Sequence, residues 1–121
     1  MHGIWLYSLR QGIRLCSLIG DAQTGSDLTQ EYLNGKQAAL EHLWDSGKQL
    51  FISGPARQIS WASQIWMCLA GVVTGPDAAR ILSRASSETG ITEMVTPFLF
   101  HHYVQALIEC EKAEIAFEEI K

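Results

Sequence analysis

The sequence lacks the features that mark several large classes of protein. Only 18% of its 121 residues are charged, the net charge is −4, and Lys and Arg form no cluster. Because nucleic-acid binding depends on basic groups that neutralise phosphates, we expect no nucleic-acid partner. No apolar run reaches the roughly 18 residues that span a bilayer, so we expect no membrane partner either.

Cysteine is also scarce, and its placement bears on the cellular compartment. Cys16, Cys68 and Cys110 lie far apart, each within an apolar helical pattern, and no CxxC motif occurs. An odd number of such thiols is typical of reduced core cysteines, which predicts a cytoplasmic protein. The histidines have no zinc-like spacing, so we expect no metal and no cofactor. The N-terminus lacks the charged start and the cleavage pattern of a signal peptide.

Helical periodicity is what the sequence does contain, and it is strongest in RQISWASQIWMCLAG, from Arg57 to Gly71. This stretch is apolar over much of its circumference, which is typical of a helix surrounded by other elements. The preceding turn, SGPARQ, brings Gln58, Ser60, Ser63 and Gln64 near the helix start, where backbone N–H groups are unpaired. Residues three and four apart share one helix face, and the apolar face predicted here comprises Trp61, Ile65, Leu69 and Val72.

Start and stop signals predict two helices before this stretch. The first covers about residues 2–19 and ends at Gly20. A polar loop, DAQTGSD, then leads to a second helix that Ser26 or Asp27 would cap. Glycine disfavours a helix interior, so Gly35 in the second helix predicts either a close crossing with another helix or a break into two.

The remaining segments are short and mostly helical. Residues 50–53, LFIS, predict a brief extended stretch, too short to found a sheet. The central helix then covers about residues 59–73. A fourth helix starts at Thr74 and a fifth near Pro97, each with a proline in its first turn. A last helical segment follows from Glu111.

These elements predict an all-α fold of five or six helices packed as antiparallel hairpins in a single domain, residues 1–121. Helices that are apolar all round alternate with helices that carry one apolar stripe. This alternation favours a layered arrangement, with the third and fifth helices inside and the second, fourth and sixth outside.

Two segments, RQISWASQIWMCLAGVV and TPFLFHHYVQALIE, resemble the later part of the catalytic domain of α-L-rhamnosidase-like glycoside hydrolases. IWLYSLRQGIRLCSLIGD and LWDSGKQLFISGP fit the stretch that precedes it, so the resemblance covers nearly the whole chain. The family fold is a toroid of six α-helical hairpins with inner and outer rings, which agrees with the alternation described above. Because the family's domain is several times longer, the resemblance implies that the domain here is incomplete.

The resemblance also implies that the catalytic groups are missing. The family's general acid lies upstream of the segments present here, and its general base is a glutamate in a downstream Trp-Glu motif; neither motif occurs. An inverting glycosidase needs two carboxyl groups about 6.5–9.5 Å apart, one protonated and one ionised. We therefore assign no catalytic residue, and we expect the C-terminal glutamates to form a solvated helix face.

Four side chains are candidates for binding a sugar. Trp61 would stack on a sugar ring, and Gln58 and Gln64 would form hydrogen bonds with hydroxyl groups. His101 is the fourth candidate, since neighbouring residues on a helix point about 100° apart and His102 would face elsewhere. The alternative for each is a structural role, such as a buried tryptophan or a histidine with satisfied hydrogen bonds.

Three functions are compatible with this sequence. The favoured one is a fragment or truncated relative of a rhamnosidase-like hydrolase, inactive alone but with a sugar as a possible ligand. The others are an active glycosidase formed by oligomer assembly and a non-catalytic helical module that binds proteins. An incomplete toroid leaves apolar surface uncovered, so we expect a homo-oligomer that covers the third and fifth helices or the two chain ends.

Overall fold

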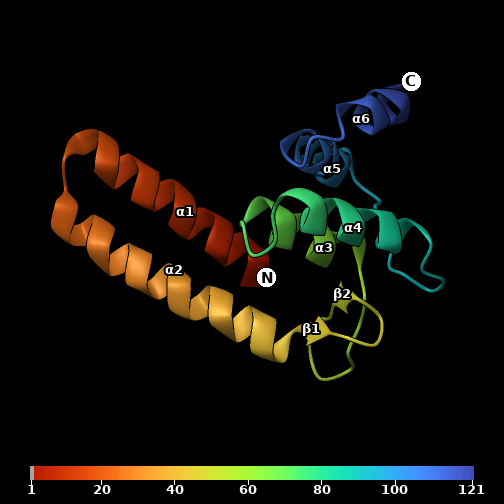
Figure 1. Cartoon of the computed structure of the whole chain (residues 1–121), viewed down its shortest axis with the longest axis horizontal. Coiled ribbons are helices and arrows are strands. Elements are labelled where there is room, and N and C mark those ends of the chain that lie inside the picture. The colour runs from red at the N-terminus through yellow and green to blue at the C-terminus, as the bar shows by residue number, and fades with distance from the viewer. Residues whose placement is uncertain (1) are drawn as a thin grey trace.

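The computed structural model describes residues 2–121, and within them it confirms the predicted all-α fold (Figure 1). In chain order the elements are α1 (His2–Ile19), α2 (Ala22–His42), β1 (Trp44–Asp45), β2 (Leu50–Phe51), α3 (Trp61–Leu69), α4 (Gly75–Ser86), α5 (Pro97–Glu109) and α6 (Ala113–Ile120). Within the described residues, none of the helices combines the length and hydropathy that crossing a membrane requires.

The helices pack as three consecutive hairpins. α1 contacts α2, α3 contacts α4, and α5 contacts α6, while α3 also contacts both α1 and α5. The first helices of the three hairpins therefore form one row, with α3 in the middle, and the second helices pack onto that row. Figure 1 shows the long α1–α2 hairpin extending away from α3 and α4, with α5 and α6 on the opposite side.

Gly35 lies where α1 and α2 cross closely. A Cβ atom at this position would stand 2.7 Å from both Leu6 Cδ2 and Trp5 Cζ3, so a larger side chain would push the helices apart. His2 Nε2 also donates a hydrogen bond to the Gly35 carbonyl oxygen, at 2.9 Å. Because α2 continues through Gly35, the prediction of a close crossing is confirmed and that of a break is wrong.

The start of α2 was predicted too late. The segment DAQTGSD is almost entirely helical, since α2 begins at Ala22 and Asp21 is its N-cap. Asp21 Oδ1 accepts a hydrogen bond from the backbone N–H of Thr24, at 3.1 Å. The predicted caps, Ser26 and Asp27, instead lie inside the helix. Asp21 has the same capping chemistry, but the exposed polar residues after it show no apolar periodicity.

The extended stretch predicted at LFIS forms a small sheet. β2 pairs antiparallel with β1, with Trp44 opposite Phe51 and Asp45 opposite Leu50. Leu50 and Phe51 are completely buried, and the Trp44 ring contacts the Phe51 ring edge-on at 5.0 Å between centroids. The prediction of extended structure is thus confirmed for Leu50 and Phe51, whereas the prediction that the stretch is too short to found a sheet is wrong.

α3 forms the centre of the core, as its apolar circumference predicted. Seven of its nine residues are buried, and so is the predicted face of Trp61, Ile65, Leu69 and Val72. The helix is shorter than predicted because Ser60 caps its start and Gly71, with φ of +79°, follows its end. Its burial means that the surface of α3 is already covered by the rest of this chain.

Candidate functional site

A tight turn leads the chain into α3. Ser53 and Gln58 form an antiparallel bridge, with N···O distances of 2.8 and 3.0 Å, and Gly54 enters the turn with φ of +69°. Ser60 then caps α3, its Oγ accepting a hydrogen bond from the backbone N–H of Ser63 at 3.1 Å. The turn therefore places the side chains of residue 53 and of the first turn of α3 next to each other.

Gln64 fixes this turn to the small sheet. Its Oε1 accepts a hydrogen bond from Phe51 N at 2.8 Å, and its Nε2 donates to Phe51 O at 2.8 Å and to Ser60 O at 3.1 Å. Both amide hydrogens are thus used by the backbone, and the side chain is completely buried. This geometry gives Gln64 a structural role and leaves it no donor for a sugar hydroxyl.

Trp61 and Gln58 lie at one edge of the site, where Thr92 connects them. Trp61 N donates to Thr92 O at 3.1 Å, and Gln58 Nε2 donates to Thr92 Oγ1 at 3.0 Å. Trp61 is only 7% exposed, and its ring packs against Tyr103 of α5. The indole therefore has the core position given above as its alternative role, whereas Gln58 is exposed.

His101 and His102 lie on α5 in different surroundings. His101 is exposed, whereas His102 is partly buried and its Nδ1 donates to Phe98 O at 2.7 Å. The His102 ring lies 4.6 Å from the Trp66 ring, and the Tyr7 ring contacts the Trp66 ring edge-on at 5.6 Å, both measured between centroids. These rings form an aromatic row across α1, α3 and α5, and the exposed His101 ring contacts the His102 ring edge-on at 5.1 Å between centroids.

A cavity of about 270 Å³ opens between the starts of α1 and α3. Among the residues that the structure describes, no Lys, Arg, Asp or Glu lines it, and none of the four sugar-binding candidates does so. Its polar lining consists of three serines and a histidine, whereas its apolar lining includes an indole. The residues that matter for its chemistry are His2, Ser53, Ser60, Ser63 and Trp66.

The three serine hydroxyls of this cavity are joined in a chain. Ser63 Oγ lies 2.8 Å from Ser53 Oγ and 3.1 Å from Ser60 Oγ. Each hydroxyl has one proton and two lone pairs, so the two links use two of the three protons. One O–H group is therefore left to donate to a molecule in the cavity. Uncharged donors and acceptors beside an indole suit a neutral ligand with several hydroxyl groups.

The sequence contained only part of the signal for this cluster. Ser60 and Ser63 were recognised near the helix start, but Ser53 lies ten residues before Ser63 and was not connected with them. The turn at Gly54 brings Ser53 next to Ser63. The closing of this turn depends on the backbone conformation, which the residue types specify only weakly.

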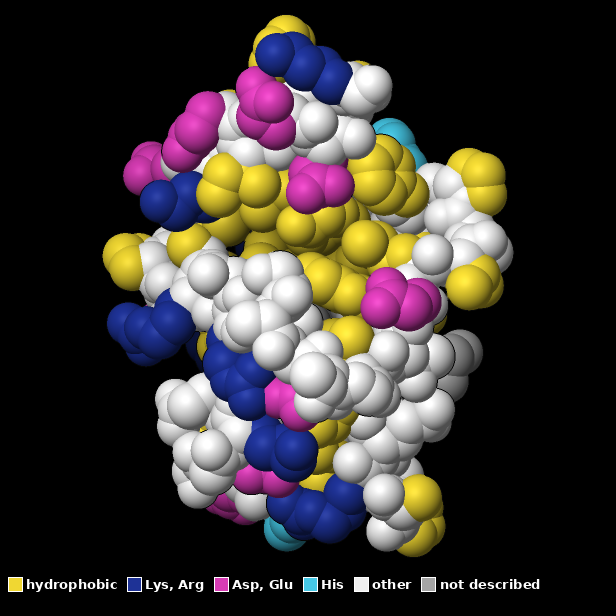
Figure 2. All heavy atoms as spheres, turned by 90° about the vertical axis from the view of Figure 1, so that its right-hand side faces the viewer, with side chains coloured by type: hydrophobic (Ala, Val, Ile, Leu, Met, Phe, Trp, Pro, Cys, Tyr) yellow, Lys and Arg dark blue, Asp and Glu magenta, His cyan; other side chains and the backbone are white. Residues whose placement is uncertain are grey.

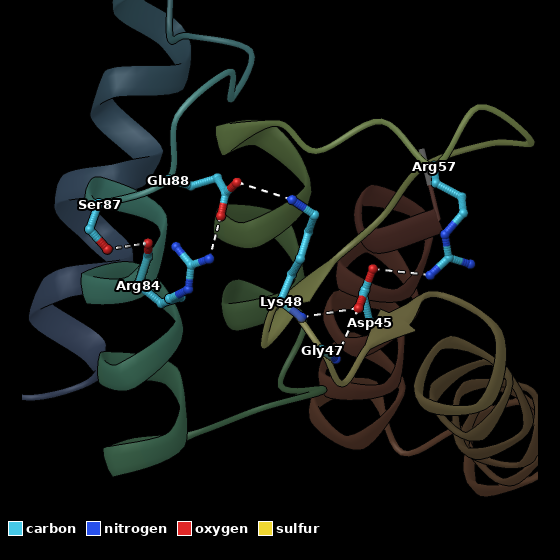
Figure 3. A network of polar contacts seen from close by, with 7 residues as sticks. All are labelled: Asp45, Gly47, Lys48, Arg57, Arg84, Ser87 and Glu88. Carbon is cyan, nitrogen blue, oxygen red and sulfur yellow. Dashed lines mark hydrogen bonds and ion pairs between the residues drawn. The ribbon is translucent and has the colours of Figure 1, made fainter.

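Asp45 stands out among the carboxyl groups of the described chain because both of its oxygens accept hydrogen bonds, three in all (Figure 3). Its Oδ1 accepts from the backbone N–H groups of Gly47 and Lys48, both at 3.0 Å, and its Oδ2 lies 3.0 Å from Arg57 Nη2. The Lys48 N–H, followed by the Arg57 guanidinium, lowers the pKa of Asp45 below its usual value.

Glu88, just after the end of α4, extends this network through Lys48. Its Oε1 lies 3.2 Å from Lys48 Nζ, and its other oxygen contacts the Arg84 guanidinium (Figure 3). Lys48, followed by Arg84, lowers the pKa of Glu88. A glycosidase acid must hold its proton near neutral pH, which requires a raised pKa. Asp45 and Glu88 are therefore suited to holding loops together and not to general acid catalysis.

The described residues contain no group of three or more His, Cys, Asp or Glu side chains placed to hold a metal ion. The chemistry that the site offers is thus neutral hydrogen bonding and aromatic contact around the start of α3.

Comparison with solved structures relates the fold of this chain to one group of enzymes. The chain superposes on a rhamnosidase from Klebsiella oxytoca with rhamnose bound, with a TM-score of 0.93 and 35% sequence identity over 99% of the chain. It also superposes on a GH78 family rhamnosidase of Bacillus sp. GL1, with a TM-score of 0.80 over 95% of the chain. At 21% identity, that second match shows the fold alone.

The chain spans only a small part of these enzymes, 23% of the first and 13% of the second. No family model matches the chain, and no curated protein does. The structural matches nevertheless confirm the resemblance to rhamnosidases that the sequence segments indicated, and with it the interpretation of the fold as part of an α/α toroid.

Proposed function

Since the chain is similar over nearly its whole length to part of a rhamnosidase, we propose that it is a fragment or truncated relative of an α-L-rhamnosidase-like glycoside hydrolase, inactive alone. The match to 23% of the Klebsiella oxytoca enzyme supports the first half of this proposal. The absence of the family's acid and base motifs, together with the lowered pKa values of Asp45 and Glu88, supports the second.

The fragment is proposed to keep one wall of a sugar site. The observation that carries this proposal is the serine cluster, which has one hydroxyl proton to spare and lines a cavity beside Trp66 that no described Lys, Arg, Asp or Glu lines. Of the four candidates, Gln58 and His101 are exposed but lie outside the lining of this cavity, so they would contact only a sugar that extends beyond it. Trp61 and Gln64 would support the wall from behind, because both are buried.

Two further properties complete the proposal. A reduced, cytoplasmic location is supported by the three cysteines, which are free and buried. A homo-oligomer is supported by large apolar side chains that stand exposed on α5 and α6, since such patches on soluble proteins mark contact sites.

The test combines titration calorimetry with L-rhamnose and hydrolysis of an aryl α-L-rhamnoside by the same purified protein. We expect weak binding without turnover, and at least about tenfold weaker binding for Ser63→Ala, which removes the central hydroxyl of the cluster. Ser83→Ala, on the exposed side of α4, is the matched control and should bind as the unchanged protein does.

Two results would contradict the proposal. Turnover that Glu88→Gln or Glu93→Gln abolishes would make the chain a working enzyme. Equal affinity of Ser63→Ala and the unchanged protein would place the sugar elsewhere.

A further inference from the structure

Two of the three cysteines line one small cavity. It has a volume of about 180 Å³ and lies between α3, α5 and the start of α4, with Cys68 and Cys110 in its lining. Both cysteines are free, and Cys68 is 8% and Cys110 6% exposed. Cys16 lines a different cavity, formed by α1 and α2, and is therefore separate from this pair.

The packing of α3 on α5 places the two thiols at the same level. The Trp61 ring of α3 packs on the Tyr103 ring of α5, with 5.1 Å between centroids. Cys68 and Cys110 each follow seven residues later in the sequence, which is about two helical turns. Because both pairs meet, α3 and α5 run in the same direction, and Cys110 lies beside Cys68 on the neighbouring helix.

The surroundings of the two thiols differ in their effect on ionisation. Burial, followed by the charge of Cys110, raises the pKa of Cys68 to about 12, so the two sulfurs are within electrostatic reach of each other. Burial also raises the pKa of Cys110, but its own backbone N–H and Lys112 oppose that rise. Since the thiolate is the reactive form, Cys110 is the thiol of the pair that reacts first.

The cavity gives a small molecule access to this pair. Arg10, Thr74 and Glu109 line it and are exposed, so it reaches the surface of the protein. Arg10 donates a hydrogen bond to Leu69 O at 2.8 Å, which holds its guanidinium at this end of α3. A water molecule occupies about 30 Å³ of liquid, so the cavity has room for an oxidant as small as hydrogen peroxide.

We propose that Cys68 and Cys110 are a redox pair, which a peroxide converts into an intramolecular disulfide. The Cys110 sulfur attacks one peroxide oxygen and the O–O bond breaks. The other oxygen leaves as water with the thiol proton, and Cys110 becomes a sulfenic acid. The Cys68 sulfur then attacks the Cys110 sulfur, the S–S bond forms, and the hydroxyl group leaves as a second water with the Cys68 proton. The two thiols lose two electrons, which reduce hydrogen peroxide to two water molecules.

The helix that such a bond would hold is α5. Few of its residues are buried, and Phe98 is 65% exposed. Figure 2 shows hydrophobic side chains gathered in the upper half of the side on which α5 and α6 lie in Figure 1. A disulfide to α3 would tie this side to the centre of the core. Reversible disulfides with a redox-sensing role also occur in the reduced cytoplasmic location proposed above.

Thiol counting on the folded protein tests the pair. The reduced chain is treated with excess hydrogen peroxide at a low micromolar concentration, then unfolded and alkylated with iodoacetamide. We expect the number of alkylated thiols to fall from three to one, and dithiothreitol to restore all three. Trypsin should release residues 58–80, which contain Cys68, joined to residues 85–112, which contain Cys110, while Cys16 is alkylated.

Three variants identify the thiols that react. Cys16→Ala is the matched control, because it keeps the pair and should lose both of its thiols on oxidation. Cys68→Ala and Cys110→Ala should each prevent the link between the two peptides, and circular dichroism would verify that all three variants are folded. The bond closes a loop of roughly 40 residues, so oxidation should raise the melting temperature of Cys16→Ala and not that of Cys68→Ala.

Two results would overturn the proposal. Oxidation of Cys110 to a sulfinic acid while Cys68 is still alkylated would show that the two sulfurs are too far apart to join. Three free thiols after treatment, or a link that includes Cys16, would show that peroxide does not join Cys68 to Cys110 in the folded chain.

Discussion

α3 and α5 share an apolar helix pattern but differ in how much of each helix is buried. Both are apolar around most of their circumference, and both begin at a hydroxyl residue that caps the helix. Yet seven of nine residues of α3 are buried, against three of thirteen in α5. An apolar circumference thus specifies that a helix needs neighbours, and whether it has them depends on the elements that the same chain places on each side.

The strongest test of this comparison removes one buried and one exposed isoleucine. Ile65→Ala in α3 should lower the free energy of unfolding by about 2–5 kcal/mol, because the Ile65 side chain is completely buried and leaves a cavity. Ile108→Ala in α5 should change it by about 0.5 kcal/mol or less, since that side chain is largely exposed.

Urea unfolding followed by circular dichroism measures both variants, at a protein concentration where the chain is monomeric. Equal losses for the two variants would mean that α5 is packed as α3 is. The comparison between the two helices would then fail.

The second prediction concerns the polar group that α3 buries. Gln64→Leu should lower the free energy of unfolding by about 2–4 kcal/mol, because the N–H and C=O of Phe51 lose their partner in the core. Gln58→Leu is the matched control in the exposed turn and should be nearly neutral. Urea unfolding again supplies the values, and a stable Gln64→Leu variant with unchanged β2 would contradict the structural role assigned to Gln64.

The third prediction compares two glycines of α1. A Cβ atom at Gly3 would meet Trp66 Cβ at 2.8 Å and the Trp66 backbone at 3.1 Å, so Gly3→Ala must move α1 away from α3 and should cost about 1–3 kcal/mol. At Gly12 the nearest atom is the tip of Leu28, at 3.2 Å. That tip can shift, so Gly12→Ala should be neutral or stabilising by up to about 1 kcal/mol.

Thermal unfolding of the two glycine variants provides the comparison. A Gly3→Ala variant as stable as Gly12→Ala would show that α1 and α3 are farther apart than described.

The sequence predicted those parts of the fold that depend on local signals. The range of α1 was predicted correctly because an apolar period runs through it and Gly20 follows it. The capped start of α5 at Thr96 was predicted from its proline. The start of α2 was missed because the residues after Asp21 are exposed and polar, so helix formation there leaves no apolar pattern.

The candidate site was less predictable because its contacts join segments distant in sequence. Periodicity placed Trp61 and Gln64 on a helix, but it did not show that Phe51 and Tyr103 would cover them. The serine cluster depends on the turn that returns Ser53 to Ser63, and the cavity that the cluster lines depends on how closely α1 approaches α3. Residue types alone carry none of this information.

The smallest expected effect comes from acidification, which tests the network that ties the loop after β1 to the end of α4. Asp45 and Glu88 have folded-state pKa values below their usual ones, so each contributes stability that is fully present above about pH 4–5 and is lost as the pH falls through the folded pKa. The urea midpoint should therefore decline from pH 6 to pH 3 in the unchanged protein. Asp45→Asn and Glu88→Gln should each flatten that decline, because a neutral amide has no proton to gain. Glu93→Gln, in the exposed connection before α5, is the control and should leave the change of the urea midpoint with pH as it is in the unchanged protein. Equal changes in all four proteins would show that the network between the loop after β1 and the end of α4 does not stabilise the fold.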